Sequence, residues 1–421
     1  MFGKKKPEVL VVGAGPVGLL TALLLVRRGI RVQIVDKEWR TGAHSYALAL
    51  HGSSLRLLAE IGLRDAILER ACPIHRIGIY DGVQRRAEVQ VSTDGLLPGL
   101  VVMPQDVLER VLEQALEQHG VRVDWNHAAG RFRAREEGVE VTIDKLVKES
   151  LGYAVAHTEW MIAKTIELHV PWVIGADGHR SQLRRSLELD FPEVGPAQHF
   201  AVFEFQSDAD LQHELRLILA DRTVNAVWPL PDGACRWSFE LPDFSVPLGP
   251  RDKERNEVQI GSAQFPALTE DHLRLLLAQR APWFQGSIDL IQWRMVVRFE
   301  RRLTQAFGRQ RMWLVGDAGH MTGPVGMQSM NVGFREARDL TGILASILCE
   351  GGSVERLPAY HEERTAEWRS LLGLEGGLHA GAGTAPWLQQ QRDRLLAGLP
   401  ASGADLAAAA RQLNLEYVRG P

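Results

Sequence analysis

A glycine-rich turn near the start of the chain is the first place where residue types and spacing indicate chemistry. Gly13, Gly15 and Gly18 form the pattern GxGxxG directly after the apolar run 9–12. In such a turn the first glycine permits a tight bend, the second lets the backbone approach a pyrophosphate, and the third lets a helix pack on a strand. The free N–H groups at the start of the following helix then face the anion. The pattern predicts a dinucleotide site, with a purely structural glycine turn as the alternative.

An acidic residue stands where a dinucleotide ribose would lie. Asp36 ends the apolar run 32–35, eighteen residues after Gly18, and Lys37 follows it. A carboxylate at this place accepts hydrogen bonds from a ribose diol and would repel a 2′-phosphate. FAD or NAD is therefore expected at this turn in preference to NADP, and Asp36 and Lys37 are predicted to belong to the site.

Two later turns also place an acid after a short apolar run. Asp177 stands in GADGHRS after the run 172–174, and Gly316 and Asp317 follow the run 312–315. A strand that ends in an acidic turn is the same arrangement as the one at Asp36. Taken alone, the turn at Asp177 could be any turn.

The elements that must position these turns divide into two groups. Short continuous apolar runs suit buried parallel strands, and the segments 19–28 and 328–348 read as helices beside them. Between residues 201 and 241 the chain instead has short alternating runs that suit an antiparallel sheet. These runs are 203–205, 216–219, 224–229 and 236–241.

Aromatic residues in the alternating runs are candidate substrate contacts. Trp228, Trp237 and Phe239 could line a pocket for an aromatic ring, because flat apolar walls bury a ring well. Burial in the core is the more frequent fate of strand aromatics, and it stays open here. His320 could relay protons, with a packed structural histidine as the alternative.

The last fifty residues differ in composition from the rest. Glycines cluster between residues 373 and 383, which predicts a linker or hinge, and the segments 387–396 and 404–413 carry helical patterns. Nothing in this part indicates chemistry.

Composition excludes several function classes. The net charge of −4 gives no global reason to bind nucleic acid or anionic lipid, and the apolar content of 45% is ordinary for a soluble protein. The three cysteines form no CxxC pair, so neither a disulfide framework nor a metal site is expected, and a reducing, cytoplasmic location is the simplest interpretation. The apolar run 10–26 follows three lysines, yet its glycines and proline argue against a signal peptide or a membrane span.

The motifs VVGAGPVG, GADGHRS and GDAGHMTGPVGMQSMN occur in the order found in the class A flavoprotein monooxygenases, and from residue 8 to about 369 the chain resembles that family. The family includes p-hydroxybenzoate hydroxylase. The resemblance implies an α/β fold, in which a doubly wound Rossmann-like FAD-binding domain is interleaved with a mainly antiparallel β-sheet substrate domain, and a helical C-terminus follows. The implied FAD-binding domain comprises residues 1–72, 100–185 and 297–350, the substrate domain 73–99 and 186–296, and the C-terminal segment 351–421.

The resemblance also implies roles for individual residues. Gly13, Gly15 and Gly18 would cradle the FAD pyrophosphate, Asp36 would hold the adenosine ribose, and Gln105 would contact the flavin side chain. Asp177 would serve FAD and the nicotinamide cofactor, and Asp317, after Gly316, would bind the ribityl or pyrophosphate part. Pro324 would line the face where oxygen reacts, and backbone N–H groups near Met330 and Asn331 would meet the flavin pyrimidine. Arg236 falls approximately where relatives carry an arginine near the flavin, with a surface arginine as the alternative.

The chain departs from the family pattern at three places. Ser45 and Tyr46 stand where relatives have an arginine, and Met327 stands in the usual GGQG stretch. The segment 145–164 is an insertion without an assigned role. These departures put a charged contact to the pyrophosphate and the mobility of the flavin in doubt.

The resemblance implies an FAD-dependent monooxygenase that hydroxylates an aromatic or phenolic small molecule, using NAD(P)H and O2 through a flavin hydroperoxide. An FAD-dependent reductase or oxidase of the same fold, like geranylgeranyl reductase, is one alternative. A flavin-binding protein without turnover is another. The substrate, the choice between NADH and NADPH, and the oligomeric state stay open.

Overall fold

The computed structural model describes residues 6–39, 48–95, 97–151, 157–242, 257–260 and 263–420. Ser45 and Tyr46 lie outside the described residues. Among the described residues, no helix combines the length and apolarity that crossing a membrane would need.

A six-stranded sheet in the order β10-β2-β1-β14-β23-β22 carries the predicted turns at the ends of its strands. Its first five strands are parallel and β22 is antiparallel to β23. The strands are β1 (Val9–Val12), β2 (Val32–Val35), β10 (Val123–Asp124), β14 (Trp172–Gly175), β22 (Gly308–Arg309) and β23 (Met312–Leu314). The predicted strands 9–12 and 32–35 are confirmed.

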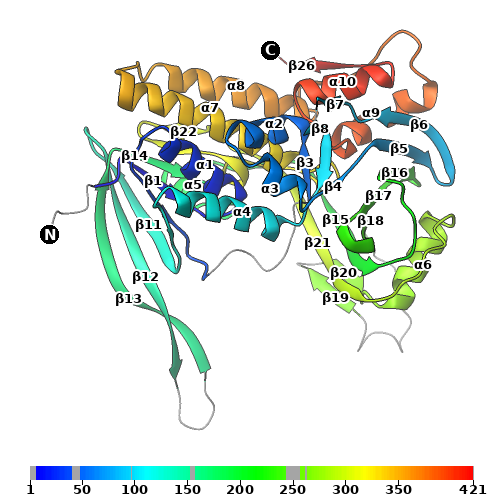
Figure 1. Ribbon diagram of the computed structural model, residues 1–421, viewed down its shortest axis with the longest axis horizontal. Helices are drawn as coiled ribbons and strands as arrows, with labels where there is room; N and C mark the ends of the chain where they lie inside the picture. Colours follow the sequence, from blue (N-terminus) through cyan, green and yellow to red (C-terminus); the bar gives the residue numbers. More distant parts are fainter. Residues whose placement is uncertain are drawn as a thin grey trace.

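Alternate residues of β1 pack against two different layers. Val9 and Val11 pack in a core with the helices, and Leu10 and Val12 pack in a second core with a small antiparallel sheet. A strand enclosed on both faces must be apolar at every position, which explains its continuous apolar run. The helical layer consists of α1 (Pro16–Arg27), α4 (Gln105–Gln118), α7 (Gln328–Glu350) and α8 (Arg356–Leu371), with α7 and α8 side by side in Figure 1.

The small sheet on the other face has the order β11-β12-β13 and includes the predicted insertion. It consists of β11 (His127–Ala134), β12 (Val139–Leu151) and β13 (His157–Val170), with α5 (Gln182–Ser186) beside β11. Beyond Lys145, which pairs with the first residue of β11, β12 pairs only with β13, and the two strands project from the body as a long hairpin (Figure 1). Trp160, Met161 and Ile162 are exposed on it.

An eight-stranded sheet, antiparallel except where β16 pairs with β5, forms the second half of the protein. Its order is β24-β21-β15-β18-β17-β16-β5-β6. The strands are β5 (Arg76–Asp81), β6 (Gln84–Gln90), β15 (Glu193–Gln206), β16 (Glu214–Ala220), β17 (Thr223–Pro229), β18 (Ala234–Leu241), β21 (Ile291–Leu303) and β24 (His320–Met321). One face joins the core of the helical layer, and α6 (Glu270–Arg280) covers the other. The predicted antiparallel sheet is confirmed.

Shorter elements connect these layers. A three-stranded sheet joins β3 (Ala49–His51), β9 (Leu100–Val102) and β4 (Cys72–Pro73), and α2 (Gly52–Glu60) and α3 (Arg64–Leu68) lie close by. Two further strand pairs are β7 (Thr93–Asp94) with β8 (Leu97–Pro98) and β19 (Glu257–Ile260) with β20 (Ala263–Pro266). Two short turns of 3-10 helix are η1 (Pro231–Gly233) and η2 (Gly316–Ala318).

The C-terminal segment is helical, as expected, but it also contains a strand pair. The helices α9 (Pro386–Gly398) and α10 (Ala404–Gln412) match the two helical patterns. The glycine cluster predicted as a linker instead contains β25 (Gly376–Ala380), which pairs with β26 (Leu415–Arg419). The linker prediction was wrong because that pairing joins residues about forty positions apart, which local composition does not reveal.

The division into two domains follows the sheets only approximately. β21 continues from residue 291 to 303 and so crosses the predicted boundary at 297, and β24 also pairs with it. The exact boundaries stay a prediction.

Candidate functional site

A cavity of about 700 Å³ lies between the parallel sheet and the eight-stranded sheet. Its walls come from the start of α1, the turn after β14, the turn after β23, the loop 321–324, the start of α7, and residues 297–300 of β21. Six of the predicted cofactor residues line it, namely Gly15, Gln105, Gly316, Asp317, Pro324 and Met330. The three motif turns, distant in sequence, therefore meet at one cavity.

The three glycines of the first turn have three different environments. A Cβ atom on Gly13, whose φ is +102°, would lie 2.3 Å from the carbonyl oxygen of Ala176, and one on Gly18 would lie 2.0 Å from the carbonyl oxygen of Gly13. A Cβ on Gly15 would have no atom within 4 Å. Gly13 and Gly18 are thus required by the fold itself, whereas Gly15 leaves open space beside the cavity at the N-terminus of α1.

Asp36 ties the first turn to the end of β2. Its Oδ2 accepts a hydrogen bond from the backbone N–H of Ala14 at 2.6 Å, and its Oδ1 accepts one from Glu38 N–H at 2.8 Å. Each carboxylate oxygen can accept a second hydrogen bond, so a ribose diol remains a compatible partner. Lys37 beside it is exposed, and neither residue is among those lining the 700 Å³ cavity.

Asp177 lies behind the cavity wall and caps a helix. Its Oδ2 accepts hydrogen bonds from the N–H groups of Gln182 at 2.7 Å and Leu183 at 3.3 Å, at the start of α5. Burial raises the pKa of this carboxyl group, against the effect of those hydrogen bonds. Its Oδ1 is buried, and among the described residues it has no hydrogen-bond partner. The neighbouring His179 and Arg180 line the cavity instead.

Arg184 is a functional candidate that the sequence analysis missed. Its guanidinium donates to the carbonyl oxygen of Ala318 and to that of His179, both at 2.7 Å, and it lies 3.8 Å from the centroid of the Phe191 ring. It therefore joins the turn after β14 to the turn after β23. Burial lowers its pKa to about 10. The only sequence signal for Arg184 was its position seven residues after Asp177, just beyond the motif GADGHRS.

A chain of polar contacts leads from Asp317 into the core. The hydroxyl of Ser329 donates to Asp317 and lies 3.3 Å from Nδ1 of His320. His320 is buried and stacks on Trp368 at 3.8 Å, and its Nε2 lies 3.0 Å from the carboxylate of Glu336. The structure thus supports a packed, structural position for His320. Glu336 was not predicted, because one acid within a long amphipathic helix resembles any other.

The start of α7 faces the cavity with its free N–H groups. Met327 is the N-cap, with a left-handed φ of +48°, and Met327, Ser329 and Met330 line the cavity. The first four N–H groups of a helix have no acceptor within it and carry its positive end. The side chain of Asn331 points elsewhere: its Nδ2 donates to the carbonyl oxygens of Met327 at 2.7 Å and Ala49 at 2.9 Å.

The predicted substrate aromatics lie in the core. Trp237 and Phe239 stack at 5.1 Å on the face of the sheet that α6 covers, together with Trp283. Trp228 faces the other side and is fully buried in the main core. Strand alternation explains the division, because neighbouring residues point to opposite faces. The structure does not bring these three residues to the cavity, whereas Val297 and Phe299 of β21 do line it.

Arg236 is buried and forms an ion pair with Glu204 on the neighbouring strand. Its guanidinium also lies 5.3 Å from the centroid of the Trp293 ring. Burial lowers its pKa, against the effect of Glu204. It is neither a surface residue nor a lining residue of the cavity, and a role near the flavin stays a prediction.

A buried histidine behind the cavity should make the protein sensitive to acid. His51 has a pKa lowered to about 3, because of burial first, with Asp405 opposing the shift and Arg335 adding to it. The unfolded chain therefore takes up a proton more readily, and stability that is present above pH 6.5 is lost as the pH falls towards 3.

The acid sensitivity attributed to His51 can be tested with two glutamine variants. The wild type should lose about 2 kcal/mol of unfolding free energy through this group between pH 7 and pH 5, and His51→Gln should not lose that part. Urea denaturation at both pH values measures the difference. His379→Gln, at an exposed histidine, is the control and should behave like the wild type. Equal acid losses in His51→Gln and the wild type would contradict the prediction.

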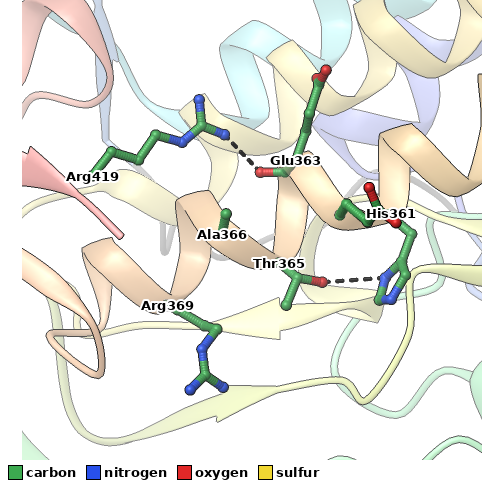
Figure 2. Close-up of a pocket in the computed structure, with 7 residues that line it drawn as sticks. His361, Glu363, Thr365, Ala366, Arg369 and Arg419 are labelled. Carbon is green, nitrogen blue, oxygen red and sulfur yellow. Dashed lines mark hydrogen bonds between the residues drawn. The ribbon is translucent and has the colours of Figure 1, made fainter. Parts of the chain in front are cut away.

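A second depression, of about 750 Å³, lies on the outer side of α8 (Figure 2). Its polar groups bond to one another: Arg419 donates to the carbonyl oxygen of Glu363 at 2.7 Å, and the hydroxyl of Thr365 lies 3.2 Å from Nδ1 of His361. None of the motif residues lines it. The 700 Å³ cavity is therefore the candidate site.

The fold and the cavity define a dinucleotide-binding protein with a second sheet facing the cofactor site. Residues 6–372 match the model of the FAD binding domain family, and the chain belongs to that family.

Two bacterial monooxygenases match most of the chain. It is 28% identical over 376 residues to a 6-methylpretetramide 4-monooxygenase of Streptomyces rimosus, covering 87% of this chain and 60% of that relative. It is 26% identical to a flavin-dependent monooxygenase of Mycobacteroides abscessus, covering 91% of this chain and 77% of the relative. The chain thus spans about 60% of the length of the first relative.

Among solved structures, p-nitrophenol 4-monooxygenase PnpA from Pseudomonas putida DLL-E4 is similar in fold, with a TM-score of 0.70 and 21% identity. The match covers 98% of this chain and 99% of that one. The predicted fold class, a Rossmann-like FAD-binding domain interleaved with a mainly antiparallel sheet, is confirmed.

Proposed function

We propose that the chain is an FAD-dependent monooxygenase that hydroxylates an aromatic or phenolic small molecule with NAD(P)H and O2. The observation that carries the proposal is the shared cavity, because the motif turns form one wall and β21 of the antiparallel sheet forms another. A cofactor and an organic substrate can then meet in one shared space. Family membership and the monooxygenase relatives support the same reading.

The residues in and next to the cavity fit FAD. The open space at Gly15 and the free N–H groups of α1 suit a pyrophosphate, and Asp36 suits a ribose diol. Asp317 is exposed to the cavity and suits a hydroxyl-bearing side chain such as ribityl.

Bound FAD would supply the electron transfer and oxygen activation that hydroxylation needs. The chain contributes orientation and electrostatics. The N–H groups at Met327–Met330 would favour negative charge at the flavin pyrimidine. Pro324, Val297 and Phe299 would line the reacting side with apolar surface and keep water away. Cytoplasmic location and the use of NAD(P)H are parts of the same proposal.

The test is to purify the protein, record bound flavin, and measure NADH and NADPH oxidation with phenols, aromatic acids and polycyclic phenols. Substrate-stimulated oxidation should be accompanied by incorporation of one atom of 18O from labelled O2 and by little hydrogen peroxide. Bound FAD without stimulated oxidation would favour a reductase or a flavin-binding protein without turnover. A protein that takes up no FAD would refute the proposal.

A further inference from the structure

The loop formed by residues 324–328 leads from the cavity into α7. On its side away from the cavity, this loop contacts the C-terminal segment. A Cβ on Gly326 would lie 2.5 Å from the carbonyl oxygen of Ala397, so the two backbones touch there. The Nε2 of Gln328 donates to the carbonyl oxygens of Leu396 at 2.8 Å and Ala401 at 3.4 Å. Among the described residues that line the cavity, none follows residue 330. The C-terminal segment therefore reaches the loop only from behind.

His51 connects the same loop to the same segment. Its Nε2 lies 3.1 Å from the carbonyl oxygen of Gly326, and its Nδ1 lies 3.3 Å from the hydroxyl of Ser402. A carbonyl only accepts, so Nε2 carries the proton, and the neutral ring then accepts from Ser402 at Nδ1. The Ser402 oxygen in turn accepts from Arg335 at 3.0 Å. Each of these three hydrogen bonds therefore joins one donor to one acceptor.

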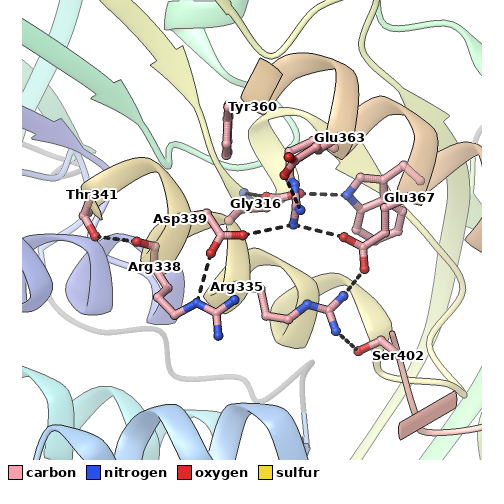
Figure 3. Close-up of polar contacts among 12 residues, drawn as sticks. Gly316, Arg335, Arg338, Asp339, Thr341, Tyr360, Glu363, Glu367 and Ser402 are labelled. Carbon is pink, nitrogen blue, oxygen red and sulfur yellow. Dashed lines mark hydrogen bonds and ion pairs between the residues drawn. The ribbon is translucent and has the colours of Figure 1, made fainter. Parts of the chain in front are cut away.

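The series of hydrogen bonds continues from Arg335 to a buried ion pair. Figure 3 shows Arg335 directed at Ser402 with one nitrogen and at Glu367 with another. Glu367 also pairs with Arg364 at 3.0 Å, one turn earlier on α8. Because these groups are largely buried and mutually paired, Ser402 is held firmly against His51.

The loop needs such support because of its backbone. Met327 adopts φ +48° and ψ +31°, a left-handed conformation that costs free energy for a residue with a side chain. Asn331 holds the Met327 carbonyl from one side, and His51 holds the Gly326 carbonyl from the other. These anchors determine where the free N–H groups of α7 stand relative to the cavity.

We propose that His51 and Ser402 are positioning residues, through which the C-terminal segment sets the place of the α7 N-terminus against the flavin. The inference rests on the proposed function, since it requires bound FAD. It goes beyond the family match, which ends at residue 372, before Ser402 and the contacts at Leu396, Ala397 and Ala401. Without the His51 contact, the Gly326 carbonyl loses its donor and the loop can withdraw from the cofactor.

The test compares His51→Leu, which removes the ring donor, with His51→Gln, whose Nε2 can still donate to Gly326. Apoprotein is titrated with FAD to obtain Kd, and the midpoint potential of bound flavin is measured by dye equilibration. His51→Leu should weaken FAD binding about tenfold. The reduced flavin should lose about tenfold more affinity than the oxidised form, which lowers the potential by about 30 mV. His51→Gln should stay within about threefold of the wild-type Kd.

Leu277→Ala, on the buried face of α6, is the control for a general loss of stability. It should lower the melting temperature without changing Kd or potential. If His51→Leu does not fold, Ser402→Ala carries the test and should weaken FAD binding about threefold to fivefold.

Wild-type FAD affinity and potential in His51→Leu would overturn the inference, as would equal shifts in Leu277→Ala at the same loss of melting temperature. Both outcomes presuppose wild-type protein that binds FAD. Failure of the wild type to bind FAD would instead refute the proposed function and the inference with it.

Discussion

Replacing Gly15 with alanine is expected to leave the apoprotein folded and to weaken FAD binding about 100-fold, or about 2.7 kcal/mol. The added Cβ meets no protein atom within 4 Å, and the backbone at φ −70° and ψ 179° suits any residue. The new methyl group would occupy the space through which a pyrophosphate approaches the start of α1. Titration of apoprotein with FAD measures the loss, and urea denaturation measures the stability.

Gly18→Ala is the matched contrast in the same turn. Its Cβ would lie 2.0 Å from the carbonyl oxygen of Gly13, so the helix and the turn must separate. A loss of at least about 3 kcal/mol of unfolding free energy is expected, with FAD binding lost as a consequence. Equal stability losses in Gly15→Ala and Gly18→Ala would show that the division of roles between the two glycines is wrong.

Replacing Glu336 with alanine is expected to cost about 4 kcal/mol of unfolding free energy. Its Oε2 accepts from Gly316 N–H at 2.8 Å and from His320 Nε2 at 3.0 Å, and its Oε1 accepts from Trp368 Nε1 at 2.8 Å. All of these groups are buried, so alanine leaves three donors without a partner. Burial alone would raise the pKa of Glu336, but His320 and the hydrogen bonds outweigh it and hold that pKa below its ordinary value.

Glu336→Gln separates the charge from the hydrogen bonds. Glutamine keeps one acceptor oxygen, so it should lose about half as much stability as alanine. Urea denaturation of the three proteins checks the order. FAD affinity should follow the same order, because Gly316 lines the cavity and α7 packs against it. A Glu336→Ala protein as stable as the wild type would contradict the prediction.

The cofactor half of the fold could be predicted because its signals are local. The run 9–12 is apolar at every position since both faces of β1 are enclosed, and the run 32–35 is apolar except at Gln33. The three motif turns were found separately in the sequence. That they meet at one cavity follows from their places at the ends of parallel strands in one sheet.

The substrate half could not be predicted residue by residue. The strand containing Trp237 and Phe239 was recognised, but the face they occupy depends on what covers each side of the sheet. On the side of Trp237 and Phe239 the sheet is covered by α6 and Trp283, which come later in the sequence. Val297 and Phe299 line the cavity but belong to no sequence motif. In a sequence, an apolar residue that lines a cavity looks the same as one that packs in a core.

The sequence by itself determined the glycine turn, the acids at Asp36 and Asp317, and the class of cofactor, because close backbone approach and strand burial restrict residue types within a few positions. Only the tertiary structure decided which buried polar groups act together. His51 is separated by 275 residues from Gly326 and by 351 residues from Ser402, and the three meet through packing of the C-terminal segment behind the cavity. Hydrogen bonds between such distant residues leave no spacing pattern, since any donor and acceptor brought together by the fold can form them.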